Sequence, residues 1–376
     1  MPVSSWTVPG VSQTRGVRPP NKPGRSEPDR NLCPVGRVLP GVPRPRWRPI
    51  LRRALLCLSW ASIGVAAALA VGRHWAFDSW LGVSAVALAP WSVLPAGVAV
   101  LGLLALSGWR AAVPATVLVA LAGWPLIVTA VPGSQSASAP IVTVMTANTE
   151  HGQADPNALV ATVTTRGVDV LALQELTAGS IDALSSAGLD RVLPYRSIAV
   201  QPGGTDVGLW SRYPLTDTHM PTGFTVNPVQ ARITVGGHQV SVIAFHSQAP
   251  VSERTTQAWQ SDLRRLADIM RTAGASTVVA GDFNATRDHL QFRDLLAAGY
   301  TDSGSDAGAG LLRTYPADRF WGPLVGIDHV LVGADLVGVE VGTVAQPGSD
   351  HRAVVAAVAP RDAAAAMLGS GDRPSG

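Results

Sequence analysis

The sequence predicts an α/β domain preceded by N-terminal transmembrane helices. Long apolar runs free of charged residues lie between residues 54 and 131. From Ile141 onward, short apolar strand-like runs alternate with helical patterns, as in α/β proteins with buried sheets. The composition agrees, because 47% of the 376 residues are hydrophobic and 15% are charged, which suits a chain partly in lipid.

Charge is distributed unevenly along the chain. Met1–Arg110 holds 13 Arg and Lys against 3 Asp and Glu, whereas Ile141–Pro360 holds 14 Arg against 21 Asp and Glu. The basic part fits attraction to an anionic membrane surface. The acidic part lacks the broad basic face of a non-specific nucleic-acid binder, so nucleic acid is possible but not favoured as a partner. The two cysteines, Cys33 and Cys57, lie outside the acidic part, which excludes a disulfide framework or Cys-ligated zinc there.

The first 50 residues are rich in Pro, Arg and Gly and have no helical or strand period, which predicts a disordered cytoplasmic tail. A membrane anchor is predicted at residues 51–131. Its first span, Ala54–Gly72, is uncharged and about 19 residues long, enough to cross ~30 Å of hydrocarbon. Trp91–Ser107 is the second predicted span, after an interfacial or re-entrant segment at Trp80–Ala89. The third is Ala111–Val131, for which a buried core helix is the alternative.

The positions of the arginines predict the sidedness of this anchor. With three spans, the Arg-rich N-terminus and Arg110 both mark inner segments. Everything after Val131 then lies outside, which predicts a multi-pass plasma-membrane protein with an extracytoplasmic C-terminal domain. Two spans would instead put that domain inside. Residues 132–140, PGSQSASAP, are small and polar and predict a flexible linker, and residues 361–376 are predicted to form a second disordered tail.

Apolar runs and helix signals place the α/β domain at residues 141–360. Asp155 followed by Pro156 predicts a helix start with a capping carboxylate and Pro at the first position, and this helix is expected to end near Arg166. The predicted strands are Ile141–Asn148, Val168–Leu173, Gln239–His246, Ser276–Ala280, Ile327–Val332 and Ala353–Val358, and the two other predicted helices are Ser252–Thr272 and Asp288–Ala298.

Polar residues recur where these predicted strands end. They are Asn148, Glu175, His246, Asp282, Asn284, Asp328, Asp350 and His351. Acids and amides at strand ends converge at one edge of a sheet, where they can hold a hard divalent cation and surround a phosphate. The pattern therefore indicates a site for metal-assisted phosphoester chemistry.

Taken singly, the two central motifs have plainer explanations. In VVAGDFNAT, Asp282 and Asn284 point the same way if the chain is extended, but both could be turn residues that cap a helix beginning near Asp288. In GIDHVLV, Asp328 and His329 lie on opposite faces of a strand, so only one can enter a given cleft. A surface ion pair at an edge strand is the alternative for Asp328.

The remaining polar residues are also ambiguous alone. Glu175, at the end of an apolar strand, needs a partner, for which either a metal or an arginine would serve. His246 could be a packed or capping residue. Asp350 and His351, just before the last strand, could belong to a solvated turn.

Together and in chain order, these pieces resemble the endonuclease/exonuclease/phosphatase superfamily over about Ile141–Val358. The motifs that carry the resemblance are Asn148 after the first strand, Gln174–Glu175, Ser211–Leu215 (SRYPL), the His246 strand end, Gly281–Asn284 (GDFN), Ile327–Val332 (IDHVLV) and Ser349–His351 (SDH). The resemblance implies a four-layer α/β sandwich of the DNase I-like type, in a membrane-anchored bacterial-type member.

The same resemblance implies a metal site and a mechanism. Glu175, with Asn148 and Asp350, would hold Mg²⁺ or Mn²⁺ through oxygen ligands. The ion would assist in-line attack of water on a phosphodiester or phosphomonoester, without a covalent enzyme intermediate.

The resemblance assigns catalytic roles to five further side chains. His351, oriented by Asp328, would act as general base or stabilise the charged phosphorane. Asp282 would position the nucleophile, while Asn284 and His246 would donate hydrogen bonds to phosphate oxygens.

The substrate stays open among nucleic acid, a phospholipid headgroup and an inositol phosphate. The acidic charge and the tethering near lipid favour small or lipid substrates over long duplexes. The loop RTYPADRFWGPLVG, with Tyr315, Arg319, Phe320 and Trp321, could contact a base, a sugar or a headgroup, or could be a packed surface loop. The alternative function is a catalytically inactive surface binding module, because a fold does not fix a function.

Overall fold

The computed structural model describes residues 47–133, 139, 141–200 and 206–361. The predicted tails up to residue 46 and from residue 362, and the linker positions 134–138 and 140, lie outside the described residues. The chain divides into two units, Met1–Arg48 and Pro49–Gly376. Apart from the first two residues of the first helix, all elements described below belong to the second unit.

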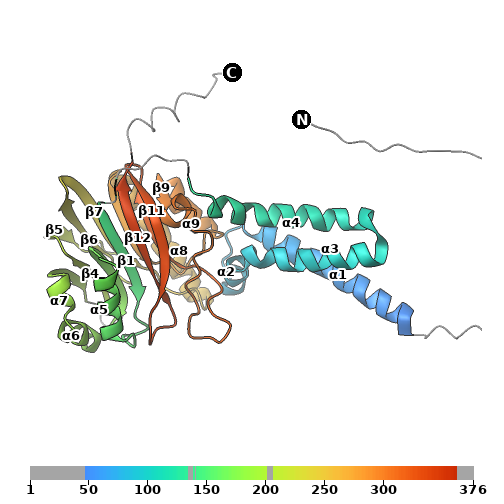
Figure 1. Cartoon of the computed structure of the whole chain (residues 1–376), viewed down its shortest axis with the longest axis horizontal. Coiled ribbons are helices and arrows are strands. Elements are labelled where there is room, and N and C mark those ends of the chain that lie inside the picture. Colours follow the sequence, from blue (N-terminus) through green and yellow to red (C-terminus); the bar gives the residue numbers. More distant parts are fainter. Residues whose placement is uncertain (1–46, 134–138, 140, 201–205, 362–376) are drawn as a thin grey trace, which may run out of the picture. The chain divides into compact units, whose positions relative to one another are not determined.

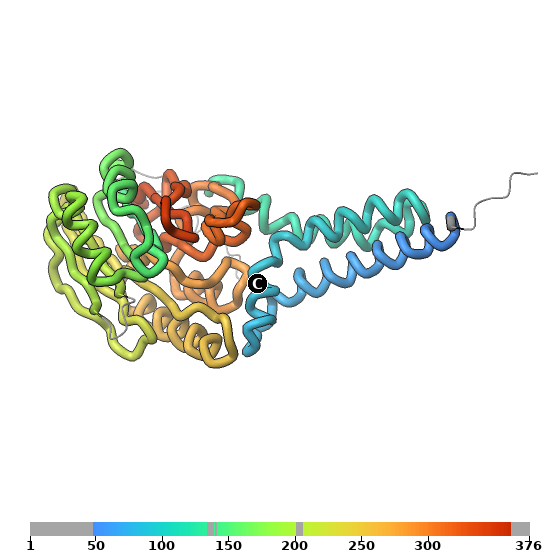
Figure 2. Tube along the Cα trace, turned by 90° about the horizontal axis from the view of Figure 1, so that it is seen from below, coloured from blue at the N-terminus to red at the C-terminus, as the bar shows by residue number. Residues whose placement is uncertain are grey.

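Among the described residues, three helical stretches are long and apolar enough to cross a membrane: Arg48–Gly72, Ala89–Ser107 and Trp109–Ala130. They correspond to α1 (Trp47–Gly72), to the 3-10 turn η1 (Ala89–Ser92) with α3 (Val93–Ser107), and to α4 (Trp109–Ala130), drawn in blue to teal in Figures 1 and 2. A further helix, α2 (Trp80–Ala87), lies between α1 and η1 in the chain. In chain order, 11%, 28% and 17% of the apolar window of these stretches is buried. The third stretch is therefore not a buried core helix.

The first helix begins earlier than the sequence predicted. Residues 47–50, assigned to the disordered tail, are helical, and α1 therefore includes Arg48, Arg52 and Arg53. Arg52 Nη2 donates to Leu106 O at 2.8 Å, near the end of α3. This bond satisfies a carbonyl that the end of a helix leaves without an intrahelical donor. The start of α1 is thus supported by a tertiary contact that local composition does not indicate.

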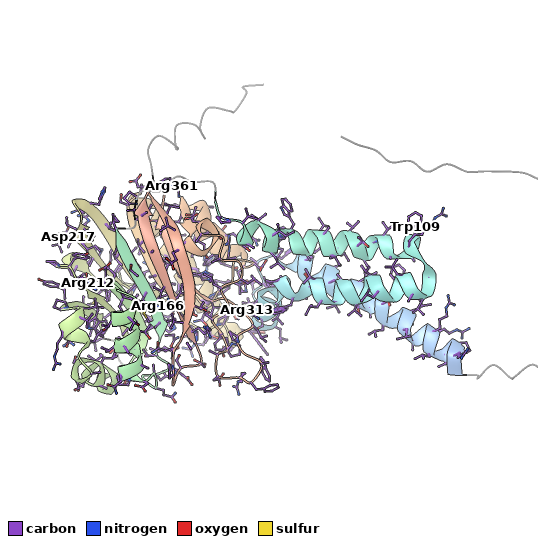
Figure 3. All side chains as sticks on the ribbon, in the orientation of Figure 1. Trp109, Arg166, Arg212, Asp217, Arg313 and Arg361 are labelled. Carbon is purple, nitrogen blue, oxygen red and sulfur yellow. The ribbon has the colours of Figure 1, made fainter. Side chains whose placement is uncertain are left out.

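The three apolar helices pack through small residues. α3 and α4 form a hairpin, with Trp109 at its turn (Figure 3). Its buried cluster consists of Ala99, Leu103, Ala112 and Ala115, against which Leu56 and Ile63 of α1 pack. Small side chains let helix backbones approach closely, which is how helices associate in lipid.

Two six-stranded mixed sheets lie at the centre of the rest of the described chain (Figure 1). The first has the order β11-β12-β1-β2-β4-β3 and consists of β1 (Val142–Asn148), β2 (Val170–Leu176), β3 (Tyr195–Ala199), β4 (Asp206–Ser211), β11 (Leu336–Ala345) and β12 (Arg352–Pro360). The second has the order β5-β6-β7-β8-β10-β9 and consists of β5 (Thr216–His219), β6 (Val229–Val235), β7 (His238–His246), β8 (Thr277–Asp282), β9 (Tyr300–Asp302) and β10 (Asp328–Gly333).

Helices cover the outer face of each sheet, which confirms the predicted four-layer α/β sandwich. The first sheet is covered by α5 (Pro156–Thr165), α6 (Ala178–Ser186) and α7 (Leu189–Val192), and the second by α8 (Glu253–Thr272) and α9 (Leu290–Ala297), with the short α10 (Ser303–Asp306) following β9. As predicted, Asp155 caps α5, because its side chain accepts hydrogen bonds from Asn157 N and Ala158 N.

Alternate side chains along each strand point into the core between the two sheets. In β1, Val142 and Val144 belong to the cluster shared by both sheets, whereas Met145 and Ala147 face the helices of the first sheet. In β8, Val278 likewise faces the other sheet. Because successive side chains point to opposite faces and both faces are buried, these strands read as continuous apolar runs.

Strand pairing brings the polar strand ends to one edge. In the first sheet, Asn148 of β1 pairs with Gln174 of parallel β2, next to Glu175. In the second sheet, Asp282 of β8 pairs with His246 of parallel β7 and with Asp328 of antiparallel β10. The predicted site residues therefore share a common rim of the sandwich.

Candidate active site

Asn148 links carboxylates from the two sheets. Its Nδ2 donates to Glu175 Oε1 at 2.9 Å and to Asp282 Oδ2 at 3.0 Å. The side chain is 1% exposed, so these bonds form away from bulk water, where a hydrogen bond to a charged group is strong. One amide thus sets the spacing of two acids from opposite halves of the sandwich.

Glu175 leaves its strand in a strained conformation. Its φ is 56°, in the left-handed region, and it lies where the pairing of β2 with β4 shifts register. Such a backbone costs about 1–2 kcal/mol in a residue with a Cβ. Thr149 Oγ1 holds the peptide by donating to Glu175 O at 2.9 Å. The kink places the carboxylate beside Asn148 instead of in the sheet.

His351 and Asp328 form a buried pair. His351 Nδ1 lies 2.9 Å from Asp328 Oδ2, while Nε2 lies 3.9 Å from Asp282 Oδ2 and 3.8 Å from Asp350 Oδ1. Burial alone would lower the pKa of His351, but the Asp328 and Asp282 carboxylates outweigh it and raise this pKa to about 10. The Tyr315 ring lies 4.9 Å from the imidazole between ring centroids. The pair is therefore fixed in orientation, with Nε2 directed toward the acids.

The acidic cluster has little permanent positive charge to balance it. Burial, and then repulsion from Asp328, raise the pKa of Asp282 to about 7. Burial lowers the pKa of His246 to about 4, although the charge of Glu175 opposes this. Within the described part of the chain, every salt-bridge partner of Glu175, Asp282 and Asp328 is a histidine.

This donor set fits a divalent cation. Two groups have ligand atoms within 4.8 Å of one another: Glu175 with His246 and Asp282, and Asp282 with Asp328 and His351. Crowded, buried carboxylates and an amide offer the oxygen ligands that Mg²⁺ and similar ions prefer. A bound cation would also add positive charge beside Glu175 and Asp282, where His351 is the one protonated neighbour among the described side chains.

All eight predicted site residues meet at this rim, but two do so differently from expectation. Asn284 is not extended: its φ is 46°, and its Nδ2 donates to Ser247 O at 3.0 Å and Asp282 Oδ2 at 3.4 Å. Asp350 is outside both groups of clustered ligand atoms and meets the site through His351.

The structure decides between the alternatives for the two central motifs. Asp282 and Asn284 do not cap the following helix, because α9 begins at Leu290 with His289 at its N-cap position. Asp328 and His329 do lie on opposite faces. His329 contacts Asp302 at 2.7 Å and Ala285 O at 3.0 Å, away from the site.

Sequence reasoning missed two contributors next to Asn148. His151 Nε2 lies 3.5 Å from Glu175 Oε2, and its backbone N–H donates to the same oxygen at 3.1 Å. Glu150 Oε2 accepts a 2.7 Å bond from Asp350 N. Both residues have positive φ. The polar residues that directly follow buried β1 could have indicated that Glu150 and His151 belong to the site.

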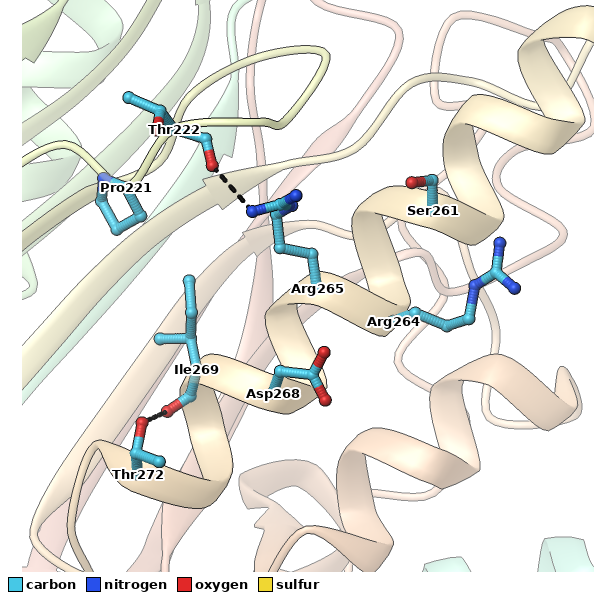
Figure 4. A pocket seen from close by; sticks show the side chains of 8 residues that line it. All are labelled: Pro221, Thr222, Ser261, Arg264, Arg265, Asp268, Ile269 and Thr272. Atoms are coloured by element: carbon cyan, nitrogen blue, oxygen red, sulfur yellow. Dashed lines mark hydrogen bonds between the residues drawn. The ribbon is translucent and has the colours of Figure 1, made fainter.

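A surface hollow along α8 has no comparable chemistry. It measures about 590 Å³ and lies along α8, where Arg265 donates to Thr222 O across its floor (Figure 4). Arg264 and Asp268 also line it, but none of the site residues does. We therefore assign the chemistry to the rim that holds Asn148 and His351.

A sandwich with clustered acids and a His–Asp pair at its rim defines a metal-dependent phosphoester hydrolase. The chain belongs to the Endonuclease/Exonuclease/phosphatase family, whose family model matches residues 145–351. Members of this family use divalent metals, as predicted. None of the curated proteins compared with the sequence matches it.

Solved structures similar to this chain include a humanized TDP2 from D. rerio, with a TM-score of 0.48, 15% identity and coverage of 58% of this chain and 98% of that chain. A beta toxin variant from Staphylococcus aureus with bound magnesium ions gives a TM-score of 0.45, 16% identity and coverage of 58% and 99%. An endonuclease/exonuclease/phosphatase from Bacteroides vulgatus gives a TM-score of 0.46 and 16% identity, with coverage of 58% of this chain and 98% of that chain.

Proposed function

We propose that the chain is a membrane-anchored hydrolase that cleaves a phosphodiester or phosphomonoester by in-line attack of water. The observation that carries this proposal is the junction made by Asn148, which holds Glu175 and Asp282 together beside the His351–Asp328 pair. Acids, an amide and an oriented imidazole from two sheets have no structural need to meet in this way. They do suit a phosphate with a divalent cation.

Glu175 and Asn148 would hold the cation, Mg²⁺ or Mn²⁺, with Asp350 as the third proposed ligand. The ion would polarise a phosphoryl oxygen and stabilise the leaving oxygen. The buried position of Asn148 and the fixed backbone of Glu175 keep these ligands in place before substrate arrives.

The chain's own residues would move the protons and place the substrate. Asp328 accepts from His351 Nδ1–H, which leaves Nε2 as the atom that exchanges a proton with water or stabilises the phosphorane. Asp282, 3.9 Å from that nitrogen, would position the attacking water.

His246 and Asn284 would complete the phosphate pocket. His246 Nε2 faces Glu175 and Asp282, and no partner contacts its buried Nδ1 among the described residues. Asn284 Nδ2 already donates to Ser247 O and Asp282. In this geometry Asn284 fits best as a positioning residue for Asp282, while His246 is the better donor to a phosphate oxygen.

The proposed setting is the outer face of the plasma membrane. Arg52 and Arg53 near the start of α1 and Arg110 at the start of α4 lie toward one end of the helices, and the catalytic domain follows α4 at the other. An excess of arginine marks the inner side. Tethering near lipid and an acidic domain favour a small or lipid phosphoester over nucleic acid as substrate.

The test is hydrolysis by purified full-length protein in detergent, with Mg²⁺, Mn²⁺ or EDTA. The panel would contain DNA, sphingomyelin, inositol phosphates and bis-p-nitrophenyl phosphate. We expect metal-dependent turnover that His351→Ala abolishes. His238→Ala, at the exposed start of the strand that ends in His246, should retain it. A folded protein with no turnover on any compound would instead support a binding module.

A further inference from the structure

A second cavity, of about 520 Å³, is lined by both the membrane helices and the catalytic domain. Its apolar wall includes residues of α4 from Leu118 to Thr129, together with Val71 near the end of α1. At 1.5 Å per residue, that part of α4 spans roughly 16 Å along the helix axis. The cavity is therefore long enough to follow several methylene groups of an acyl chain.

Three arginines occupy the polar part of this cavity: Arg73, Arg287 and Arg293. The acid among the lining residues is Asp288, whose Oδ1 lies 2.9 Å from Arg73 Nη2. Arg293 Nη1 donates to Asp288 O at 2.8 Å, and its Nη2 donates to Arg73 O. Three cationic side chains thus line the cavity with one carboxylate, while Asp294 and Asp302 interact with Arg293 and Arg287 from outside its lining.

Some N–H donors of these three arginines have no hydrogen-bond partner among the described residues. Within the described residues, no hydrogen bond or salt bridge holds the half-buried Arg287 side chain, and the buried Arg73 Nε has no acceptor. A buried donor without a partner costs free energy, and an excess of guanidinium groups in a partly apolar cavity is stable only with an anion nearby. Guanidinium groups match the oxygens of a phosphate closely.

We propose that this cavity binds an anionic phospholipid of the surrounding bilayer. Its phosphate would lie among Arg73, Arg287 and Arg293, and an acyl chain would lie along the Leu118–Thr129 side of α4. A free anion would occupy the arginines but leave the apolar wall uncovered. The site lies at the ends of the predicted spans, where headgroups meet water. The inference rests on the membrane anchor in the proposed function and is independent of catalysis.

The bound lipid would tie the catalytic domain to the anchor. Arg73 follows α1, Arg287 precedes α9, and Arg293 lies within α9. A phosphate among them would neutralise their mutual repulsion and connect the two regions at one point. The lipid would thus act as a structural ligand of the junction.

The experiment uses the full chain carrying His351→Ala, so that bound lipid cannot be hydrolysed. The protein would be reconstituted into nanodiscs that contain phosphatidylcholine and phosphatidylglycerol, then extracted, and its retained lipid counted by native mass spectrometry. We expect one phosphatidylglycerol per chain, retained at least about tenfold over phosphatidylcholine. Adding Arg287→Gln should weaken retention about tenfold or more, whereas Arg254→Gln, on the exposed side of α8, should not change it.

The outcomes separate the lipid site from the anchor. If the chain enters nanodiscs but retains both lipids equally, or if Arg287→Gln has no effect, the lipid site is overturned and the anchor stands. Displacement of the lipid by inorganic phosphate alone would show a simple anion site and also overturn the proposal. A chain that does not enter bilayers would overturn the anchor, and the lipid site with it.

Discussion

Replacing Asp328 by Asn would measure how much the orientation of His351 contributes to hydrolysis. Asp328 is 1% exposed, and its Oδ2 lies 2.9 Å from His351 Nδ1. The substitution preserves the volume of the side chain, but it removes the charge and lets an amide N–H face Nδ1, which would reverse the imidazole tautomer. Because a well-placed acid or base contributes about 10²- to 10⁴-fold, we expect kcat to fall by that factor.

The chain offers a matched control on the opposite face of the same strand. His329 and Asp302 form a second buried pair, 2.7 Å apart, that does not face the site. Asp302→Asn should lower the free energy of unfolding by about 1–3 kcal/mol, as should Asp328→Asn, because each leaves a buried partner poorly satisfied. The control should change kcat by less than about tenfold, the equivalent of ~1.4 kcal/mol.

The assay is the initial rate at saturating substrate and Mg²⁺, divided by the folded fraction from thermal unfolding of the same samples. A kcat for Asp328→Asn within tenfold of the unmodified enzyme would refute the catalytic role of the pair. An equal loss of kcat in both variants would refute it as well, because the effect would then reflect the stability of the strand.

Three further predictions follow from the same geometry. Asn148→Ala removes the amide between Glu175 and Asp282, so the Mg²⁺ concentration that gives half-maximal activity should rise by about 10- to 100-fold; an unchanged titration would argue against this bridge. Gly281→Ala would place a Cβ 1.9 Å from Phe245 O and should lower the free energy of unfolding by about 3 kcal/mol. Gly167 has open space around it but a φ of 60°, so Gly167→Ala should lower the free energy of unfolding by only about 1 kcal/mol. Burial lowers the pKa of His289 to about 4 from its usual 6.5. The unfolded chain therefore binds the proton more readily, and stability should fall by up to about 3 kcal/mol as pH drops from about 6.5 toward 4. Replacing His289 with Gln should flatten the dependence of Tm between pH 7 and 5, and a dependence as steep as before would contradict this assignment.

Most of the buried strands could be predicted because both of their faces are apolar, but β4, whose residues are all buried, was missed. Apolar runs as short as those in β1, β7 and β8 favour strands, because buried helices are usually longer. The exposed strands were not predicted. All residues of β5 are exposed and carry no alternation. In β6, by contrast, apolar and polar residues alternate in the sequence, and this pattern could have predicted the strand.

The predicted site followed from strand ends, but its internal geometry did not. That Asn148 and Asp282 share a hydrogen bond depends on how two sheets stack, and no local pattern encodes this. The left-handed conformations of Glu175 and Asn284 were also hidden, because neither position carries a glycine. Tyr315 reaches His351 from a long loop whose course the sequence does not determine.

The junction with the N-terminal apolar helices depends on similarly remote contacts. The segment Trp80–Ala89, predicted to be interfacial or re-entrant, contains α2, whose Val83 is buried in the core of the second sheet and its helices. Val83 O accepts from His289 Nε2 at 2.9 Å. Gln260 of α8 donates to Phe77 O at 2.9 Å. Each contact joins residues far apart in the chain, so composition indicates an anchor but not where it docks.

One segment of the second sheet carries both the site and the junction. Asp282 lies at the rim that holds Asn148 and His351, while Asp288 and His289, a few residues later, contact Arg73 and Val83. No mobile linker separates the two functions within this stretch, because it runs through buried residues. In the proposed function Asp282 positions the attacking water, so the same short, largely buried stretch would join that role to the contacts with Arg73 and Val83.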